Sequence, residues 1–159
     1  MANTQTREQT ILCVDDNEAG LRIREALLRT FGFEVRLATS GAAALKMMES
    51  AHFDAVILDY HMPEMDGAEL TDRIKRGYPQ MPIVMLTGYA QDVPPRTLQL
   101  LDAIIVKGDA TEKLLETLHR LTGTEFKRPP MSVHQITTRN ADQFDAVSKY
   151  LKTQRQGRR

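Results

Sequence analysis

Residues 55–59 read AVILD, a run of four apolar residues that stops at a carboxylate. Three other short apolar runs also stop at a polar residue: ILCV (11–14) at Asp15 and Asp16, IVML (83–86) at Thr87, and AIIV (103–106) at Lys107. Short runs rich in Val and Ile, separated by helical patterns, are typical of buried strands in a parallel sheet. Such sheets bind ligands at the carboxyl ends of their strands. We therefore expect three carboxylates, one hydroxyl and one ammonium at one edge of a single sheet.

Helical patterns separate the runs, and EVRLA (34–38) alternates apolar and charged residues as an edge strand does. The predicted helices are 17–31, a segment that Ser40 opens, 68–76, a short helix beginning at Pro95, and 111–121. Five strands that alternate with five helices predict an α/β fold with a parallel sheet and right-handed crossovers.

A chain of 159 residues with 42% hydrophobic residues is long enough for one domain with a proper core. We expect a tail over 1–8, the domain over 9–123 and a second tail over 124–159. The single cysteine, Cys13, excludes an internal disulfide and a cysteine zinc site. No apolar segment has the length of a signal peptide or a membrane span, so a soluble cytoplasmic protein is expected.

The formal net charge of zero conceals an asymmetry between the domain and the C-terminal tail. Residues 124–159 hold eight basic and three acidic side chains, a net charge of +5, which leaves −5 on residues 1–123. Three interpretations of the tail stay open: a disordered solvated segment, a short helix near 140–152 that docks on a partner or a second copy, or a nucleic-acid or anionic-surface contact. The third is the least favoured because the chain as a whole has no net charge.

The polar residues at the strand ends suit phosphoryl transfer. A carboxylate on a rigid strand end, such as Asp59, can attack phosphorus and form an acyl phosphate. That reaction depends on positioning and on offsetting the phosphate charge, and Asp15 and Asp16 could hold Mg²⁺ for the purpose. The Thr87 hydroxyl could donate to a phosphoryl oxygen, and the Lys107 ammonium could pair with the same group.

With these residues the sequence resembles the receiver domain of two-component response regulators. The resemblance covers about residues 9–122, and LDYHMPEMDG (58–67) is its most specific element. It implies a flavodoxin-like fold with strand order 2-1-3-4-5. It also implies that Asp59 accepts a phosphoryl group from a sensor histidine kinase or a phosphotransfer protein. By the same resemblance, Mg²⁺ is held by Asp15, Asp16, Asp59 and the main-chain carbonyl of His61, and Thr87 and Lys107 contact the phosphoryl group.

Three positions depart from the pattern of that family. Gly108 follows Lys107 where the family usually has a proline, so Lys107 could be differently aimed. Ile104 stands where many receivers have a switch aromatic, a role that Tyr89 could partly take. Pro94 and Pro95 shorten the fourth helix. The departures lie on the face that receivers use for output, which predicts an atypical output partner or dimer geometry.

The predicted function is a stand-alone, CheY-like response regulator with output by protein contact or phosphorelay, and no enzyme beyond its own phosphorylation and dephosphorylation. A homodimer is left open, and nucleic acid is not an expected partner. One rival is a receiver-like binding module that is never phosphorylated. Another is a haloacid-dehalogenase-type phosphohydrolase, disfavoured because His61 occupies the place of that family's second Asp. A third is a DNA regulator that acts through the tail.

Overall fold

The computed structural model describes residues 7–109 and 111–125. Within them, the strands are β1 (Thr10–Val14), β2 (Glu34–Ala38), β3 (Ala55–Asp59), β4 (Ile83–Thr87) and β5 (Ala103–Val106). The helices are α1 (Glu18–Thr30), α2 (Gly41–Ser50), α3 (Gly67–Gly77), α4 (Pro95–Leu98) and α5 (Thr111–Thr122), with a 3₁₀ turn η1 (Ala90–Asp92). The helix considered near 140–152, and with it every interpretation of the basic tail, lies outside the described residues.

All five strands are parallel, and their order is β2-β1-β3-β4-β5. This confirms the predicted flavodoxin-like fold, including β2 as an edge strand. Residues 14 and 58 are register partners, as are 59 and 86, and 87 and 106. The four strands that end in polar residues therefore end side by side, at one edge of the sheet.

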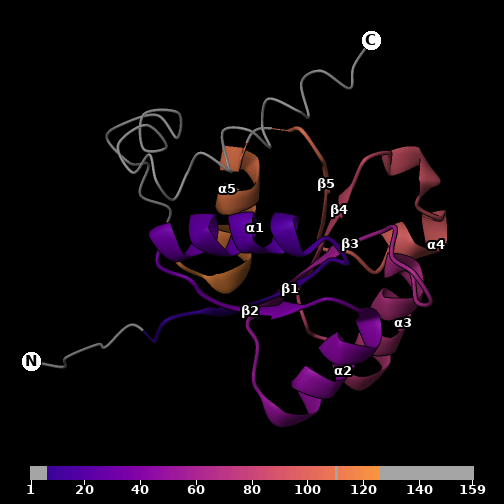
Figure 1. Ribbon diagram of the computed structural model, residues 1–159, viewed down its shortest axis with the longest axis horizontal. Coiled ribbons are helices and arrows are strands. Elements are labelled where there is room, and N and C mark those ends of the chain that lie inside the picture. The colour runs from indigo at the N-terminus through magenta and orange to yellow at the C-terminus, as the bar shows by residue number, and fades with distance from the viewer. Residues whose placement is uncertain (1–6, 110, 126–159) are drawn as a thin grey trace, which may run out of the picture.

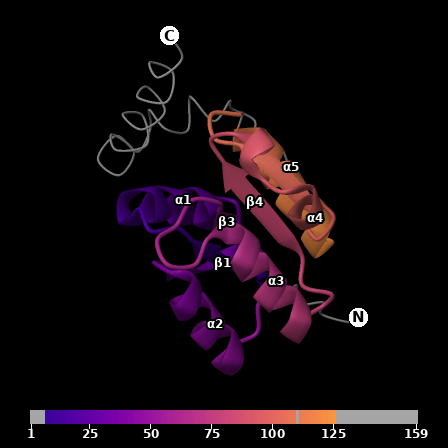
Figure 2. The same cartoon turned by 90° about the vertical axis from the view of Figure 1, so that its right-hand side faces the viewer.

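Helices cover both faces of the sheet and form two hydrophobic cores (Figure 1). On one face, α1 and α5 pack Leu21, Leu28 and Leu115 against β-strand side chains. On the other, α2 and α3 contribute Met48 and Leu70. Figure 2, which is turned by 90° from Figure 1, shows the same arrangement, with α1 on one side of the sheet and α2 and α3 on the other. Because both faces are covered, the central strands β1 and β3 carry the unbroken apolar runs 11–14 and 55–58 seen in the sequence.

Side-chain caps fix where the helices begin. Asn17 accepts a hydrogen bond from the Gly20 amide, and Ser40 accepts one from the Ala43 amide. The predicted short helix α4 begins at Pro95, because proline suits a first helical position and lacks the amide that a later position needs. The predicted helix boundaries hold to within one residue at these ends.

Cys13 lies in the middle of the sheet, in β1, and is completely buried. Burial raises the pKa of its thiol to about 12, and the neighbouring Arg24 charge opposes that rise. The cysteine is therefore a packing residue.

No helix in the described part of the chain is long and apolar enough to span a membrane.

Candidate functional site

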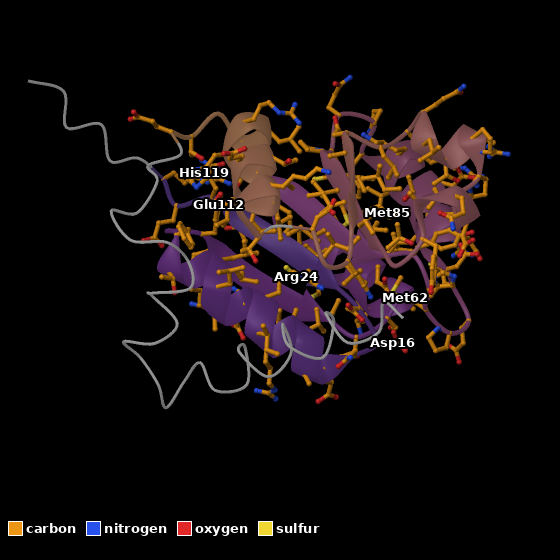
Figure 3. All side chains as sticks on the ribbon, turned by 90° about the horizontal axis from the view of Figure 1, so that it is seen from above. Asp16, Arg24, Met62, Met85, Glu112 and His119 are labelled. Atoms are coloured by element: carbon orange, nitrogen blue, oxygen red, sulfur yellow. The ribbon has the colours of Figure 1, made fainter. Side chains whose placement is uncertain are left out.

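Three carboxylates meet at the carboxyl edge of the sheet. One oxygen each of Asp15, Asp16 and Asp59 lies within 4.8 Å of the other two. Asp15 and Asp59 are buried, whereas Asp16 is exposed, so the cluster opens to solvent on one side. Figure 3 shows Asp16 at the same end of the molecule as Met62, in the loop after β3. The predicted acidic group is therefore brought together.

This cluster has the composition of a magnesium site. Mg²⁺ prefers carboxylate oxygens, and it keeps several water molecules when it binds to proteins. Three carboxylates within 4.8 Å repel one another, which a cation relieves, and the exposed side leaves room for waters. The donor set of Asp15, Asp16 and Asp59 thus fits the metal that the sequence predicted.

Lys107 reaches directly into the cluster. Its ammonium Nζ lies 2.8 Å from Asp59 Oδ1 and 3.9 Å from Asp15 Oδ2. The Lys107 amide donates to the Thr87 carbonyl at 2.7 Å, which ties the end of β5 to the end of β4. Gly108, where the resemblance leads one to expect proline, has φ +101° in the left-handed region that favours glycine. Glycine thus turns the chain here, and the departure leaves the Lys107 ammonium on Asp59.

The surroundings of Asp59 raise the pKa of its carboxyl. Its burial, the largest influence, raises the pKa above the ordinary value of 3.8, and the charge of Asp15 adds to this. The hydrogen bond and charge of Lys107 act in the opposite direction. Asp59 is therefore held on a buried strand end with a cation on one side and open solvent near Asp16 on the other.

The loop after Asp59 is held tightly against β3. A Cβ atom at Gly67 would lie 2.6 Å from the Asp59 carbonyl oxygen and 2.8 Å from the Tyr60 Cα, closer than real side chains approach. The Gly67 amide donates to the Tyr60 carbonyl at 2.8 Å, and the Asp66 carboxylate caps α3 by accepting from the Glu69 amide at 2.9 Å. Asp66 and Gly67 thus serve the turn into α3, and the close packing of Gly67 on the Asp59 backbone was missed by the sequence reasoning. This packing depends on how the loop folds back onto the end of β3, which the sequence does not show.

His61 lies two residues after Asp59, and its ring stacks edge-on against Tyr60. Its Nε2 is 3.7 Å from Asp92 Oδ2 in η1, and both side chains are largely exposed. The side chain is thus drawn toward the loop after β4. The role of its main-chain carbonyl as a metal ligand stays a prediction.

Thr87 is completely buried at the end of β4. Its hydroxyl donates to the Tyr89 carbonyl and accepts from the Tyr89 amide, each at 3.1 Å. The Tyr89 side chain is 63% exposed, whereas Ile104 is half-buried against the core under α3. The hydroxyl expected to meet a phosphoryl group is therefore engaged with its own loop, next to the exposed aromatic residue that was predicted as a switch neighbour.

Arg24, in α1, is a site residue that the sequence reasoning missed. It is 8% exposed, and its Nη2 lies 3.4 Å from Asp15 Oδ2. The available signal was its spacing, since Arg24 comes three residues after Leu21 and four before Leu28, on the apolar face of the helix. A charged side chain in such a position indicates a buried ion pair.

Comparison with known proteins identifies a family. The family described as "Response regulator receiver domain" matches residues 11–119. Among curated proteins, the sensor protein GacS of Pseudomonas syringae pv. syringae is 33% identical over 78% of this chain, which corresponds to 14% of GacS. The transcriptional regulatory protein ZraR of Klebsiella oxytoca is 34% identical over 86% of this chain and 30% of ZraR. The chain thus spans less than a third of these relatives.

Solved structures give the same result. The response regulator TrrA of Thermotoga maritima, in complex with Mg²⁺ and BeF, is 30% identical with a TM-score of 0.68. The match covers 71% of this chain and 98% of TrrA. The chemotaxis protein CheY4 of Vibrio cholerae is 31% identical with a TM-score of 0.64, over 72% of this chain and 98% of CheY4. The matched region therefore covers nearly the whole length of these two solved structures, but only a part of the longer curated relatives.

Proposed function

The chain belongs to the response regulator receiver family, and we propose that Asp59 is the residue at which it accepts a phosphoryl group. The observation that carries this proposal is the contact of 2.8 Å between Asp59 and the Lys107 ammonium, inside a cluster of three carboxylates. Asp59 is the only one of the three that stands on a strand end directly beside the lysine. It is therefore the carboxylate best placed for attack on a phosphorus atom whose oxygens the lysine can pair with.

In the proposed reaction, an Asp59 oxygen attacks the phosphorus of a phosphohistidine on the donor protein. The new bond is the mixed anhydride between the carboxylate and phosphorus, and the bond that breaks joins phosphorus to the imidazole nitrogen, which leaves with the electron pair. Bound Mg²⁺ supplies positive charge that offsets the phosphoryl oxygens. Asp15 and Asp16, with Asp59 and the main-chain carbonyl of His61, are the proposed ligands.

Two residues of the chain act on the transferred group. Lys107 exchanges its contact with Asp59 Oδ1 for a contact with a phosphoryl oxygen, so the ammonium stays paired throughout. Thr87 donates its hydroxyl hydrogen to another phosphoryl oxygen, which requires it to release the Tyr89 carbonyl. The exchange couples the phosphorylation state to the loop that carries the exposed Tyr89 side chain. That coupling supports output through a protein contact.

The proposed donor is a sensor histidine kinase or a phosphotransfer protein, and the proposed unit that accepts the phosphoryl group is the receiver over residues 9–123. The relatives named as sensor proteins and as a transcriptional regulator support a place in two-component signalling. Output by docking or phosphorelay, a cytoplasmic location and the possibility of a homodimer belong to the same proposal.

The direct test is intact-mass spectrometry after incubation with acetyl phosphate. We expect one phosphoryl adduct on the wild-type chain that depends on Mg²⁺, and no adduct on Asp59→Asn. Glu64→Gln is the matched control, because it makes the same carboxylate-to-amide change in the exposed part of the loop after Asp59 and should keep the adduct.

Other outcomes lead to the rival functions. Adduct formation by Asp59→Asn would remove Asp59 from the chemistry. No adduct with acetyl phosphate or with a phosphorylated histidine donor, together with unchanged partner binding by Asp59→Asn, would leave a receiver-like binding module.

A further inference from the structure

Arg24 places a positive charge beneath the acidic cluster, from the side of α1. Its side chain lies on the helix face that also carries Leu21 and Leu28, and only 8% of the residue is exposed. Arginine is almost never buried to this extent unless it is paired. Its partner is Asp15, whose Oδ2 lies 3.4 Å from Arg24 Nη2.

The pairing of Arg24 is incomplete. Nη1 of the guanidinium is buried and has no hydrogen-bond partner, and no other buried side-chain nitrogen or oxygen in the described residues shares this condition. A buried charge with an unsatisfied donor is costly, and an apolar side chain of similar size would avoid that cost. Packing alone therefore does not explain an arginine at this position.

Asp15 is surrounded by donors on both of its oxygens. Oδ1 accepts a hydrogen bond from the Asn17 amide at 3.0 Å. Oδ2 faces Arg24 at 3.4 Å and Lys107 at 3.9 Å. Three ionised carboxylates with Arg24 and Lys107 give the cluster a net charge of −1. Without Arg24, its net charge would be −2. A divalent cation that binds Asp15 meets the positive charge of Arg24 at close range.

We propose that Arg24 is a positioning residue that serves as an internal counter-cation for Asp15. It holds the Asp15 carboxylate in place when no metal is bound, and its charge opposes the arrival of Mg²⁺, so it lowers the affinity of the site for the metal. This inference rests on the proposed magnesium site formed by Asp15, Asp16 and Asp59. Arg24 lies on α1 and is not one of these ligands, yet it sets the concentration of Mg²⁺ that is needed to fill the site.

The test is calorimetric titration of the full chain with Mg²⁺. Arg24→Met keeps an unbranched side chain of similar length and removes the charge, so its dissociation constant should fall by about tenfold or more, because unit charges a few ångströms apart interact strongly near a protein surface. Arg24→Lys keeps the charge, and Arg22→Met removes an exposed charge from the same helix. Both controls should stay within about twofold of the wild type, since solvent screens the exposed Arg22.

A second readout separates this role from a purely structural one. Without metal, Arg24→Met leaves Asp15 with one cation fewer, so Mg²⁺ should raise the Tm of this variant more than that of the wild type. An unchanged or larger dissociation constant for folded Arg24→Met would overturn the proposal. Absence of Mg²⁺ binding in the wild type and in all variants would overturn the magnesium site itself, and this inference with it.

The wild-type chain provides a test that needs no variant. On titration with Mg²⁺, the Nε–H resonance of Arg24 in NMR spectra should shift, whereas that of Arg29, paired with Glu25 further along α1, should not. Binding of Mg²⁺ with no shift at Arg24 would overturn the inference.

Discussion

Among single residues, Gly67 shows how closely the backbone around Asp59 is packed. Its Cα faces the Asp59 carbonyl with no room for a methyl group, and the neighbouring Asp66 fixes the start of α3. The loop that follows Asp59 therefore cannot move away from β3 without losing the first turn of a helix. Such packing holds the Asp59 carboxylate in one position. The proposed phosphoryl transfer depends on positioning of this kind.

Gly67→Ala should destabilise the fold by about 1–3 kcal/mol, the usual cost of forcing an extra methyl into a tightly packed place. Gly77→Ala is the matched control, because a Cβ there meets nothing within 4 Å and α3 already ends at that residue. The control should be neutral or stabilising by up to about 1 kcal/mol, as alanine is a better helix former than glycine. Urea unfolding of both variants measures the difference, and equal stability would contradict the packing argument.

Among the elements, α4 is the shortest α-helix of the described residues. It consists of four residues, and Leu98 on it is exposed. Arg96 extends from α4 to Asp72 on α3, with an Nη2–Oδ2 distance of 2.7 Å, while Arg76 approaches the same carboxylate at 3.9 Å from within α3. The pair between Arg96 and Asp72 is therefore a tie between two elements, whereas the pair with Arg76 is a contact within one helix.

Arg96→Met should increase amide hydrogen exchange in residues 95–99 while changing the free energy of global unfolding by less than about 1 kcal/mol, because exposed ion pairs contribute little. Arg76→Met is the control, as it removes a charge at the same carboxylate without untying α4. Hydrogen exchange followed by mass spectrometry measures both. Equal protection of 95–99 in the two variants would contradict a role for Arg96 in holding α4.

The elements also show what periodicity can and cannot predict. Four strands followed from unbroken apolar runs, which a sheet covered on both faces favours, and β2 followed from its alternation of apolar and charged residues. Pro94 with Pro95 predicted the short α4. The meeting of Asp15, Asp59 and Lys107 followed from strand ends alone. By contrast, the orientation of Thr87 toward Tyr89 depends on a local turn, and the pairing of Arg24 with Asp15 depends on how α1 lies on β1. Neither is a property of spacing along the chain.

In the described part of the chain, two cores lie on opposite faces of one sheet, and the acidic cluster lies at the carboxyl edge of that sheet. Asp59 belongs to β3, the central strand, so its ionisation changes the free energy of unfolding of the fold. Because burial raises the pKa of Asp59, the folded chain holds that proton more tightly than the unfolded chain does. The resulting stability is fully present below the unfolded pKa and is lost as pH rises through the folded pKa.

Comparison of Asp59→Asn with the wild type should reveal this loss. In EDTA, so that no divalent metal is bound, the unfolding free energy of the wild type should fall relative to that of the variant as pH rises from about 3 to about 7. Urea unfolding at several pH values measures the gap between the two. A gap that stays constant, or that changes in favour of the wild type as pH rises, would contradict the raised pKa.

The single buried cysteine makes it possible to measure how often the folded chain opens. Cys13 is enclosed by neighbouring strands, and a thiol with a pKa of about 12 is protonated at any pH where the protein works. Thiol-directed dyes and cross-linkers therefore reach it only when the centre of the sheet comes apart, so its rate of labelling counts opening events. For the same reason, a cysteine introduced at an exposed position would be the only reactive thiol of the folded protein, and the docking surface could be mapped without first removing the native one.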